Sequence, residues 1–238
     1  MLSFKALLGA AGAVGKYNPL VSQPFITDCV LWLGMDDFNR YINRINGTLL
    51  TNYNVSTTNP TYDYTENPLV PVFNNTNRVG AFIRSGIFLN GSVDFAITFY
   101  VKNPIIESQY NSEVVFSNTN KTDGVGFIAA TYEKDTGTFE VGSTTYGSTV
   151  FNSTELGNIY DWLKVLITYN SLTCVMTVVI NNVIKTKTLG IYGTNYEIGI
   201  FDTTVNTGGY AMSLNGSIAD FRVYNKQLQQ FEIALYMD

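Results

Sequence analysis

The feature that most constrains the fold of this chain is a succession of short strand-like segments separated by turn signals. Residues 93–102 form one such segment, and Asn90 and Gly91 precede it as a turn dipeptide. Residues 134–137 form another turn, which leads into the segment 138–141. Short strands repeated in this way predict an all-β protein with two antiparallel sheets packed as a sandwich.

The composition agrees with strands and polar loops rather than helices. Charged residues make up only 14% of the 238 residues, and Tyr and Phe are abundant. Aromatic and β-branched residues favour strands. With no second boundary and no internal repeat, we expect one sandwich over residues 25–238, preceded by a separate segment at 1–24.

The C-terminal segment combines a strand with a short helix. Asn215 and Gly216 signal a turn, and the next residues alternate between the two faces of a strand. The strand residues expected to share one face are Ala219, Phe221 and Val223. The spacing then becomes helical, so we expect an amphipathic helix that packs against a sheet through Leu228, Phe231 and Leu235.

Several segments together carry a resemblance to a known fold family. They are the turn at Gly216, Asp-Phe-Arg-Val-Tyr at 220–224, Glu-Ile-Ala-Leu-Tyr at 232–236, the strands at 93–102 and 161–170, and a hairpin at 174–184 with the turn Asn181-Asn182. In their order along the chain, these segments resemble the laminin-G-like and concanavalin A-like jelly rolls over residues 26–238. The resemblance implies a two-sheet jelly-roll sandwich. Similar jelly rolls occur as head fibres, capsid decorations and tail-associated modules of phage virions.

Residues 1–24 differ in composition from the rest of the chain. They are small, apolar and rich in Gly, with Phe4, Leu7, Leu8 and Val14 as the larger side chains. The segment is similar to a secretory signal, but cleavage after Ala13 would leave it shorter than the usual length of about 15 residues or more. It is also too short to span a bilayer. Two alternatives remain: packing on its own sandwich, or docking as an anchoring arm on a neighbouring subunit.

Several classes of chemistry are disfavoured by the residues that are missing or scattered. The chain contains no His, which removes His-based nucleophilic catalysis and His-ligated zinc. The net charge is −5 without a basic cluster, so nucleic-acid binding is not expected. The isolated acidic residues do not supply the closely spaced carboxylate pair of a glycosidase. We therefore expect a protein that is not an enzyme and uses no cofactor.

Two cysteines and two aspartates each leave two interpretations open. Cys29 and Cys174 lie in apolar, strand-like surroundings and suit buried reduced thiols, although a disulfide between them is the alternative. Asp36 and Asp37 follow the first expected strand, at 26–33. A solvated turn is favoured there over a calcium site, because the alternating acidic spacing of a calcium loop is missing.

The favoured function is a structural or decorating subunit of a virion, with the arm as its anchor and a lectin-like sandwich facing outward. The expected partners are other virion subunits, further copies of the chain and a host glycan. The alternative is a carbohydrate-binding module of a secreted or cell-surface protein. Aromatic rings and amide or carboxyl groups recognise sugars. The loop residues that carry such groups, and thus the predicted glycan site, are Tyr146, Asp202, Asn206 and Tyr210.

Overall fold

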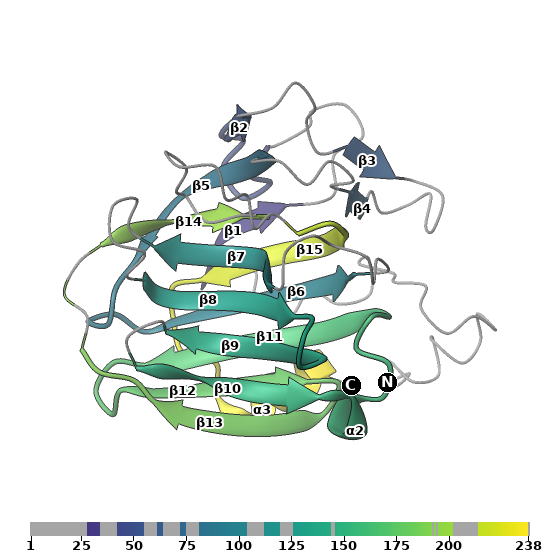
Figure 1. Cartoon of the computed structure of the whole chain (residues 1–238). Helices are drawn as coiled ribbons and strands as arrows, with labels where there is room; N and C mark the ends of the chain where they lie inside the picture. The colour runs from purple at the N-terminus through teal and green to yellow at the C-terminus, as the bar shows by residue number, and fades with distance from the viewer. Residues whose placement is uncertain are drawn as a thin grey trace.

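The computed structural model is a two-layer β-sandwich with a helix on the outer side of one sheet (Figure 1). It describes residues 28–33, 42–54, 61–63, 72–74, 81–103, 112–119, 126–143, 146–191, 193, 195–201 and 214–237. The expected all-β jelly-roll sandwich with a short C-terminal helix is confirmed. The predicted boundary at residue 24, the arm residues Phe4, Leu7, Leu8 and Val14, and Asp36 and Asp37 lie outside the described residues.

The first sheet has the strand order β13-β12-β11-β6-β15-β4-β3, and β1 also pairs with β15. Neighbouring strands of this sheet are antiparallel. Strands far apart in the sequence, such as β6 and β15, lie side by side in it. The strands are β1 (Cys29–Leu33), β3 (Thr61–Asp63), β4 (Val72–Asn74), β6 (Phe95–Lys102), β11 (Leu163–Asn170), β12 (Val175–Ile180), β13 (Val183–Thr188) and β15 (Ser217–Tyr224).

The second sheet has the order β10-β9-β8-β7-β14-β5-β2 and is likewise antiparallel. The strands are β2 (Thr51–Asn54), β5 (Ala81–Leu89), β7 (Ser112–Thr119), β8 (Gly126–Glu133), β9 (Thr138–Ser143), β10 (Gly147–Asn152) and β14 (Tyr196–Ile200). The helices are α2 (Ser153–Leu156) and α3 (Gln230–Met237). Among the described residues, no helix has the length and apolar character needed to cross a membrane.

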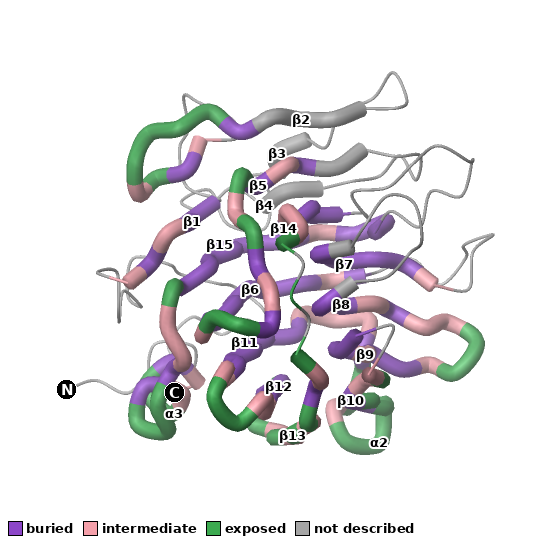
Figure 2. Tube along the Cα trace, turned by 90° about the vertical axis from the view of Figure 1, so that its left-hand side faces the viewer, coloured by how far each residue is buried: buried purple, intermediate pink, exposed green. Residues whose placement is uncertain are grey.

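Buried residues lie on the strands of both sheets (Figure 2). The main core is rich in aromatic rings. The rings of Phe99 and Phe221 stack with their centroids 5.6 Å apart, and Phe116 meets both of them edge-on. Phe95, from β6, stacks on Tyr169, from β11. Offset and edge-to-face contacts of this kind stabilise aromatic pairs beyond simple area burial. The alternating pattern of these strands therefore encodes the inner faces of the sandwich.

Two turns follow the sequence prediction closely. Asn181 and Asn182 join β12 to β13 with φ angles of 45° and 74°, the left-handed conformation that Asn adopts more readily than most residues. Gly137 closes the β8–β9 turn with a φ of 62°, and its N–H donates to the carbonyl of Lys134. Both hairpins are confirmed.

The last strand differs from its predicted alternation because it contains a bulge. Asp220 has a φ of 51°, and the register of β15 against β6 shifts between Ala219 and Arg222. The bulge brings Ile218 into the main core with Phe221 and Val223. The prediction that Ala219 shares their face is therefore wrong, because one extra residue reverses the alternation.

Helix α3 covers the outer face of the first sheet with a face different from the one predicted. Leu228, just before the helix, and Tyr236 are buried in a second core beneath it. Phe231 and Leu235 are 64% and 53% exposed, so their predicted packing against the sheet is wrong. The buried position between them belongs to Glu232, which accepts hydrogen bonds from Lys226 Nζ and from the Gln229 backbone N–H. Polar contacts at the start of the helix set its orientation.

Two further segments complete the second sheet. Strand β5 continues through its bulge as one strand from Ala81 to Leu89. Strand β9 ends at Ser143, and β10 begins at Gly147. Helix α2 then follows with Asn152 and Glu155 in a capping box.

Both cysteines are free thiols, as the favoured interpretation expected, but only Cys29 is buried. Cys29 is buried on β1, and its Sγ donates to the Leu31 carbonyl. Cys174 is half-buried and lies in the β11–β12 turn rather than in a strand, with a φ of 57°.

Candidate functional site

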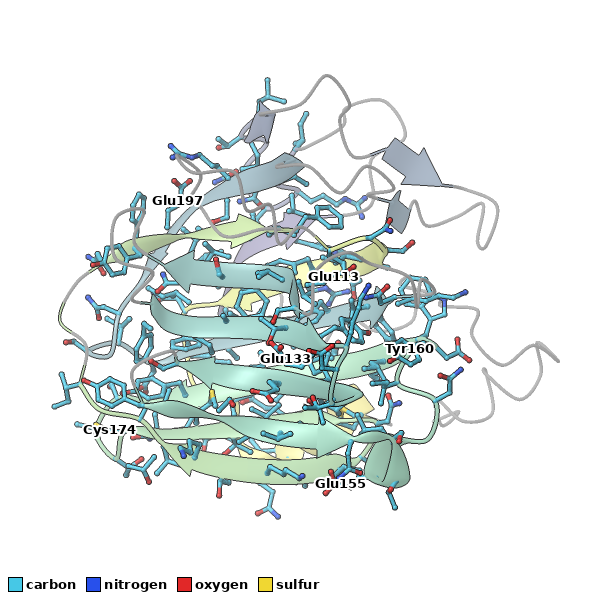
Figure 3. The ribbon with its side chains drawn as sticks, in the orientation of Figure 1. Glu113, Glu133, Glu155, Tyr160, Cys174 and Glu197 are labelled. Atoms are coloured by element: carbon cyan, nitrogen blue, oxygen red, sulfur yellow. The ribbon has the colours of Figure 1, made fainter. Side chains whose placement is uncertain are left out.

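The described residues form a small cleft of about 190 Å³, with polar and apolar lining, at the edge of the sandwich where β5 and β14 meet the turn 42–50. Figure 3 shows Glu197 of the cleft at this edge, away from Glu155 and Cys174. The residues that line the cleft are Asn43, Asn46, Thr48, Leu49, Leu50, Arg84, Ser85, Gly86, Ile87 and Glu197. Charged, amide, hydroxyl and aliphatic groups therefore share one small hollow.

A bulge in β5 builds the floor of the cleft. Arg84 pairs with Gly199 of β14 and Phe88 pairs with Glu197, so the three β5 residues between Arg84 and Phe88 stand opposite the single residue Ile198. Gly86 lies at the centre of the bulge with a φ of 71°, a conformation that glycine adopts without strain. Bulges of this kind redirect side chains and backbone groups. Here the bulge turns the Gly86 N–H toward β14.

Arg84 and Glu197 form the charged pair of the cleft. The Glu197 carboxylate accepts a hydrogen bond of 2.9 Å from the Gly86 N–H through Oε1. Its other oxygen, Oε2, lies 3.8 Å from Arg84 Nε. The Arg84 side chain is 33% exposed and the Glu197 side chain 17% exposed, and both residues line the cleft. A hydrogen-bond donor and an acceptor thus stand side by side on neighbouring strands.

Asn43 holds the turn 42–50 in place as the opposite wall. Its Oδ1 accepts hydrogen bonds from the backbone N–H groups of Trp32 and Ile45, and its Nδ2 donates to the Val30 carbonyl at 2.8 Å. The bridge between Ile42 and Leu49 closes the base of the turn. These contacts bind the turn to β1, so the wall is part of the folded sandwich.

The wall presents both polar and apolar groups. Asn46 and Thr48 are exposed, and Asn46 Oδ1 accepts from the Thr48 N–H at 3.0 Å. Leu49 is 69% exposed beside them. Gly47 follows Asn46 with a φ of 73°, as the Asn-Gly pair in the sequence predicts. The cleft therefore combines hydrogen-bonding groups with an aliphatic surface.

Of the predicted glycan-site residues, only Tyr146 is described. Its ring is half-buried and packs against the main core. The ring also lies so close to Gly190 that a Cβ there would overlap it. Tyr146 therefore seals an edge of the core. As a predicted glycan-site residue it was expected to stand in an exposed loop.

Asp202, Asn206 and Tyr210 lie outside the described residues. The residues that flank them are described: the Phe201 N–H donates to the Val115 carbonyl, and the Leu214 N–H donates to the Val114 carbonyl.

A second polar group lies at one end of the sandwich, where Figure 3 shows Glu113, Glu133 and Tyr160. Glu113 is 1% exposed and accepts hydrogen bonds from Asn103 Nδ2 at 2.7 Å and from the Asn215 N–H at 3.1 Å. Lys134 Nζ forms an ion pair with the same carboxylate. A buried carboxylate engaged by three segments of the chain ties these segments together. We therefore assign Glu113 a structural role.

No sequence pattern singled out Arg84, Glu197, Asn46 and Thr48 as site residues. One local signal was present, because Gly86 in the middle of an otherwise strand-like run indicates a bulge. Asn46 and Gly47 form a dipeptide that signals a turn but not a binding site. No local pattern joins these segments, since the turn, β5 and β14 meet only through the pairing of the second sheet.

Comparison with solved structures shows which proteins share this fold. The receptor-binding domain of botulinum neurotoxin D matches with a TM-score of 0.61 and 15% identity, covering 88% of this chain and 52% of that one. The ligand-binding domain of serotype D in complex with N-acetylneuraminic acid matches with a TM-score of 0.60, 15% identity and coverages of 88% and 50%. A mutant of Trypanosoma rangeli sialidase displaying trans-sialidase activity matches with a TM-score of 0.61 and 12% identity, covering 89% of this chain and 33% of that one.

These matches define the class of protein as a jelly-roll β-sandwich. The chain spans about half the length of the toxin domains and a third of the sialidase. No protein family and no curated protein sequence matches the chain significantly. Identity at this level establishes a shared fold, and function must be argued from the site itself.

Proposed function

We propose that this protein is a non-enzymatic, lectin-like domain that binds carbohydrate in the cleft between Arg84, Glu197 and the turn 42–50. The observation that carries the proposal is the 3.8 Å pairing of Arg84 Nε with Glu197 Oε2, from two partly exposed side chains that line one small hollow. Neighbouring hydroxyl groups of a sugar need one donor and one acceptor side by side. Arg84 and Glu197 supply them.

The remaining lining complements such a ligand. Asn46 and Thr48 offer amide and hydroxyl groups from the opposite wall, and Leu49 and Ile87 offer aliphatic surface for the apolar face of a sugar ring. Binding sites for small molecules combine a few placed polar groups with apolar lining in this way. The Gly86 N–H and the Asn43 contacts fix the two walls before a ligand arrives, which lowers the entropic cost of binding.

The similar structures support a binding role of this kind. The matched toxin domains are described as receptor-binding or ligand-binding, one of them in complex with N-acetylneuraminic acid, and these domains have the same fold as this chain. A sialidase is also among the matches. We favour binding over catalysis for two reasons. The buried carboxylate of Glu113 is held by structural contacts, and Glu197 is the single carboxylate among the described residues that line the cleft.

Ligand-observed NMR with a panel of monosaccharides tests the proposal. The intact protein should show saturation transfer to at least one sugar, and Arg84→Gln should weaken its dissociation constant about tenfold or more, because a charge-assisted hydrogen bond is lost. Lys187→Gln is the matched control, since it removes one positive charge from β13, the edge strand of the first sheet. Equal binding by wild type and Arg84→Gln would place the sugar elsewhere.

We also propose that the domain serves in an assembly, as a virion-decorating subunit anchored by residues 1–24, with other subunits, further copies of itself and a host glycan as partners. A virion is the proposed location, with a secreted or cell-surface module as the alternative. One described feature favours an assembly contact. Asp28, which follows the arm in the chain, pairs with Lys226 at 2.9 Å, just before α3, whose exposed side carries Phe231 and Leu235.

Light scattering tests the assembly role. The full chain should be larger than a monomer, whereas a chain that starts at Gln23 should be monomeric. Replacing both Phe231 and Leu235 by Gln in the full chain shows whether α3 takes part. If the full chain is itself a monomer, the arm does not drive self-association, and the isolated carbohydrate-binding module becomes the better description.

A further inference from the structure

We infer that Glu197 makes the cleft selective for uncharged sugars and excludes sugars that carry a carboxylate. The inference rests on the proposed carbohydrate-binding function and names the class of ligand for that site. It begins from the fact that the cationic group of the cleft is accompanied by an anionic one. Arg84 by itself would attract a carboxylate, as guanidinium groups commonly do.

A backbone hydrogen bond holds the Glu197 carboxylate in the cleft. Oε1 accepts the Gly86 N–H at 2.9 Å, and Oε2 faces Arg84 Nε at 3.8 Å. Gly86 occupies the centre of the bulge, and its φ of 71° directs this N–H to the carboxylate. Moving Glu197 would break its hydrogen bond with the Gly86 N–H at the bulge.

A ligand carboxylate at Arg84 would therefore meet repulsion from Glu197 as well as attraction to the guanidinium. Coulomb energies depend on distance, and the two protein charges lie only 3.8 Å apart. Glu197 thus offsets part of the attraction of Arg84 for an anion, and the anion would still lose its hydration. The Glu197 side chain is only 17% exposed, so water and salt screen its charge less than they would a surface carboxylate.

A neutral sugar meets no such penalty. One of its hydroxyls donates to Glu197 while the adjacent hydroxyl accepts from Arg84, and both protein charges keep their hydrogen bonds. The selectivity comes from an unfavourable interaction with the wrong ligand as well as a favourable one with the right ligand. Glu197 is thus the residue that sets specificity, and Arg84 is needed for either class.

Matched pairs of ligands that differ in one charge test the inference. The pairs are methyl glucoside with methyl glucuronide, methyl galactoside with methyl galacturonide, and the methyl ester of N-acetylneuraminic acid with the free acid. Dissociation constants are measured by calorimetry or ligand-observed NMR for wild type and for Glu197→Gln, Arg84→Gln and Glu140→Gln. Gln at 197 can still accept the Gly86 N–H. Glu140, on β9, has its carboxylate bound by Ser148 and does not line the cleft, so it controls for a general loss of charge.

We expect the wild type to prefer the neutral member of a bound pair by tenfold or more. Glu197→Gln should abolish or reverse this preference by strengthening the binding of the acid, whereas Glu140→Gln should keep it and Arg84→Gln should bind neither member well. Thermal unfolding of each variant confirms that it is folded.

The outcomes separate the two proposals. Equal binding of both members by wild type, or an unchanged preference in Glu197→Gln, overturns the selectivity and leaves the binding function intact. If neither wild type nor Glu197→Gln binds any member of the pairs, the proposed function fails at this cleft and the selectivity fails with it.

Discussion

Trp32 Nε1 donates a 2.8 Å hydrogen bond to Asp220 Oδ1, a residue 188 positions later in the chain. The same oxygen accepts from Arg222 Nε at 2.8 Å, and the Arg222 guanidinium lies 4.5 Å from the centroid of the Trp32 ring. Asp220 is fully buried at the bulge of β15. This network joins the first described strand to the last one and holds the bulge in place.

Replacing Asp220 by Asn should destabilise the protein strongly. Asn tolerates the φ of 51° and still accepts a hydrogen bond, so the change isolates the loss of the negative charge beside buried Arg222. Breaking a buried ion pair on one side costs about 3–5 kcal/mol. Urea denaturation measures the loss. Asp135→Asn, in the exposed β8–β9 turn, is the control and should stay within about 0.5 kcal/mol. A small loss for Asp220→Asn would show that the network adds little to stability.

Cys29 should make stability fall at alkaline pH. Burial raises the pKa of its thiol from 9.0 to about 11, so the unfolded state releases the proton first. The stabilising contribution is complete below about pH 9 and is lost as the pH rises through the folded-state value. Between about pH 8 and about pH 10.5 the wild type should lose about 2 kcal/mol more than Cys29→Ser does, measured by denaturation under reducing conditions. Parallel losses in the two proteins would contradict the assignment, because the buried tyrosines are common to both.

Gly190 and Tyr146 should behave as a coupled pair. A Cβ at Gly190 would overlap the Tyr146 ring, so Gly190→Ala should cost about 1–3 kcal/mol through overpacking. In the double variant with Tyr146→Ala the two losses should not add, since the overlap disappears with the ring. Gly193→Ala, where a Cβ meets nothing within 4 Å, is the matched control. Additive losses would mean that Tyr146 does not pack on Gly190.

The two faces of α3 should respond differently to substitution. Phe231→Gln and Leu235→Gln should each change the stability of the monomeric sandwich by less than about 0.5 kcal/mol, because both side chains are largely exposed. Leu228→Ala should cost about 2–5 kcal/mol, because Leu228 is 2% exposed in the core beneath the helix. The comparison uses urea midpoints of the chain that starts at Gln23. A large loss of stability for Phe231→Gln would show that α3 packs on the sheet through the face predicted by helical spacing.

The sequence by itself determined the sandwich, because alternation and turn chemistry are local properties. The strands at 93–102 and 161–170 were recognised from their residues, and Asn181-Asn182 was recognised as a turn from its tolerance of positive φ. The free state of the two cysteines was also favoured correctly.

Only the tertiary structure decided which residues of the last strand face the main core, which face of α3 is buried and where the cleft lies. The bulge at Asp220 is stabilised by Trp32 and Arg222, and the orientation of α3 by Lys226 with Glu232. The cleft requires Asn46, Arg84 and Glu197, which lie far apart in the sequence and meet through strand pairing. Contacts of this kind depend on which segments become neighbours after folding, and no local spacing of residues encodes them.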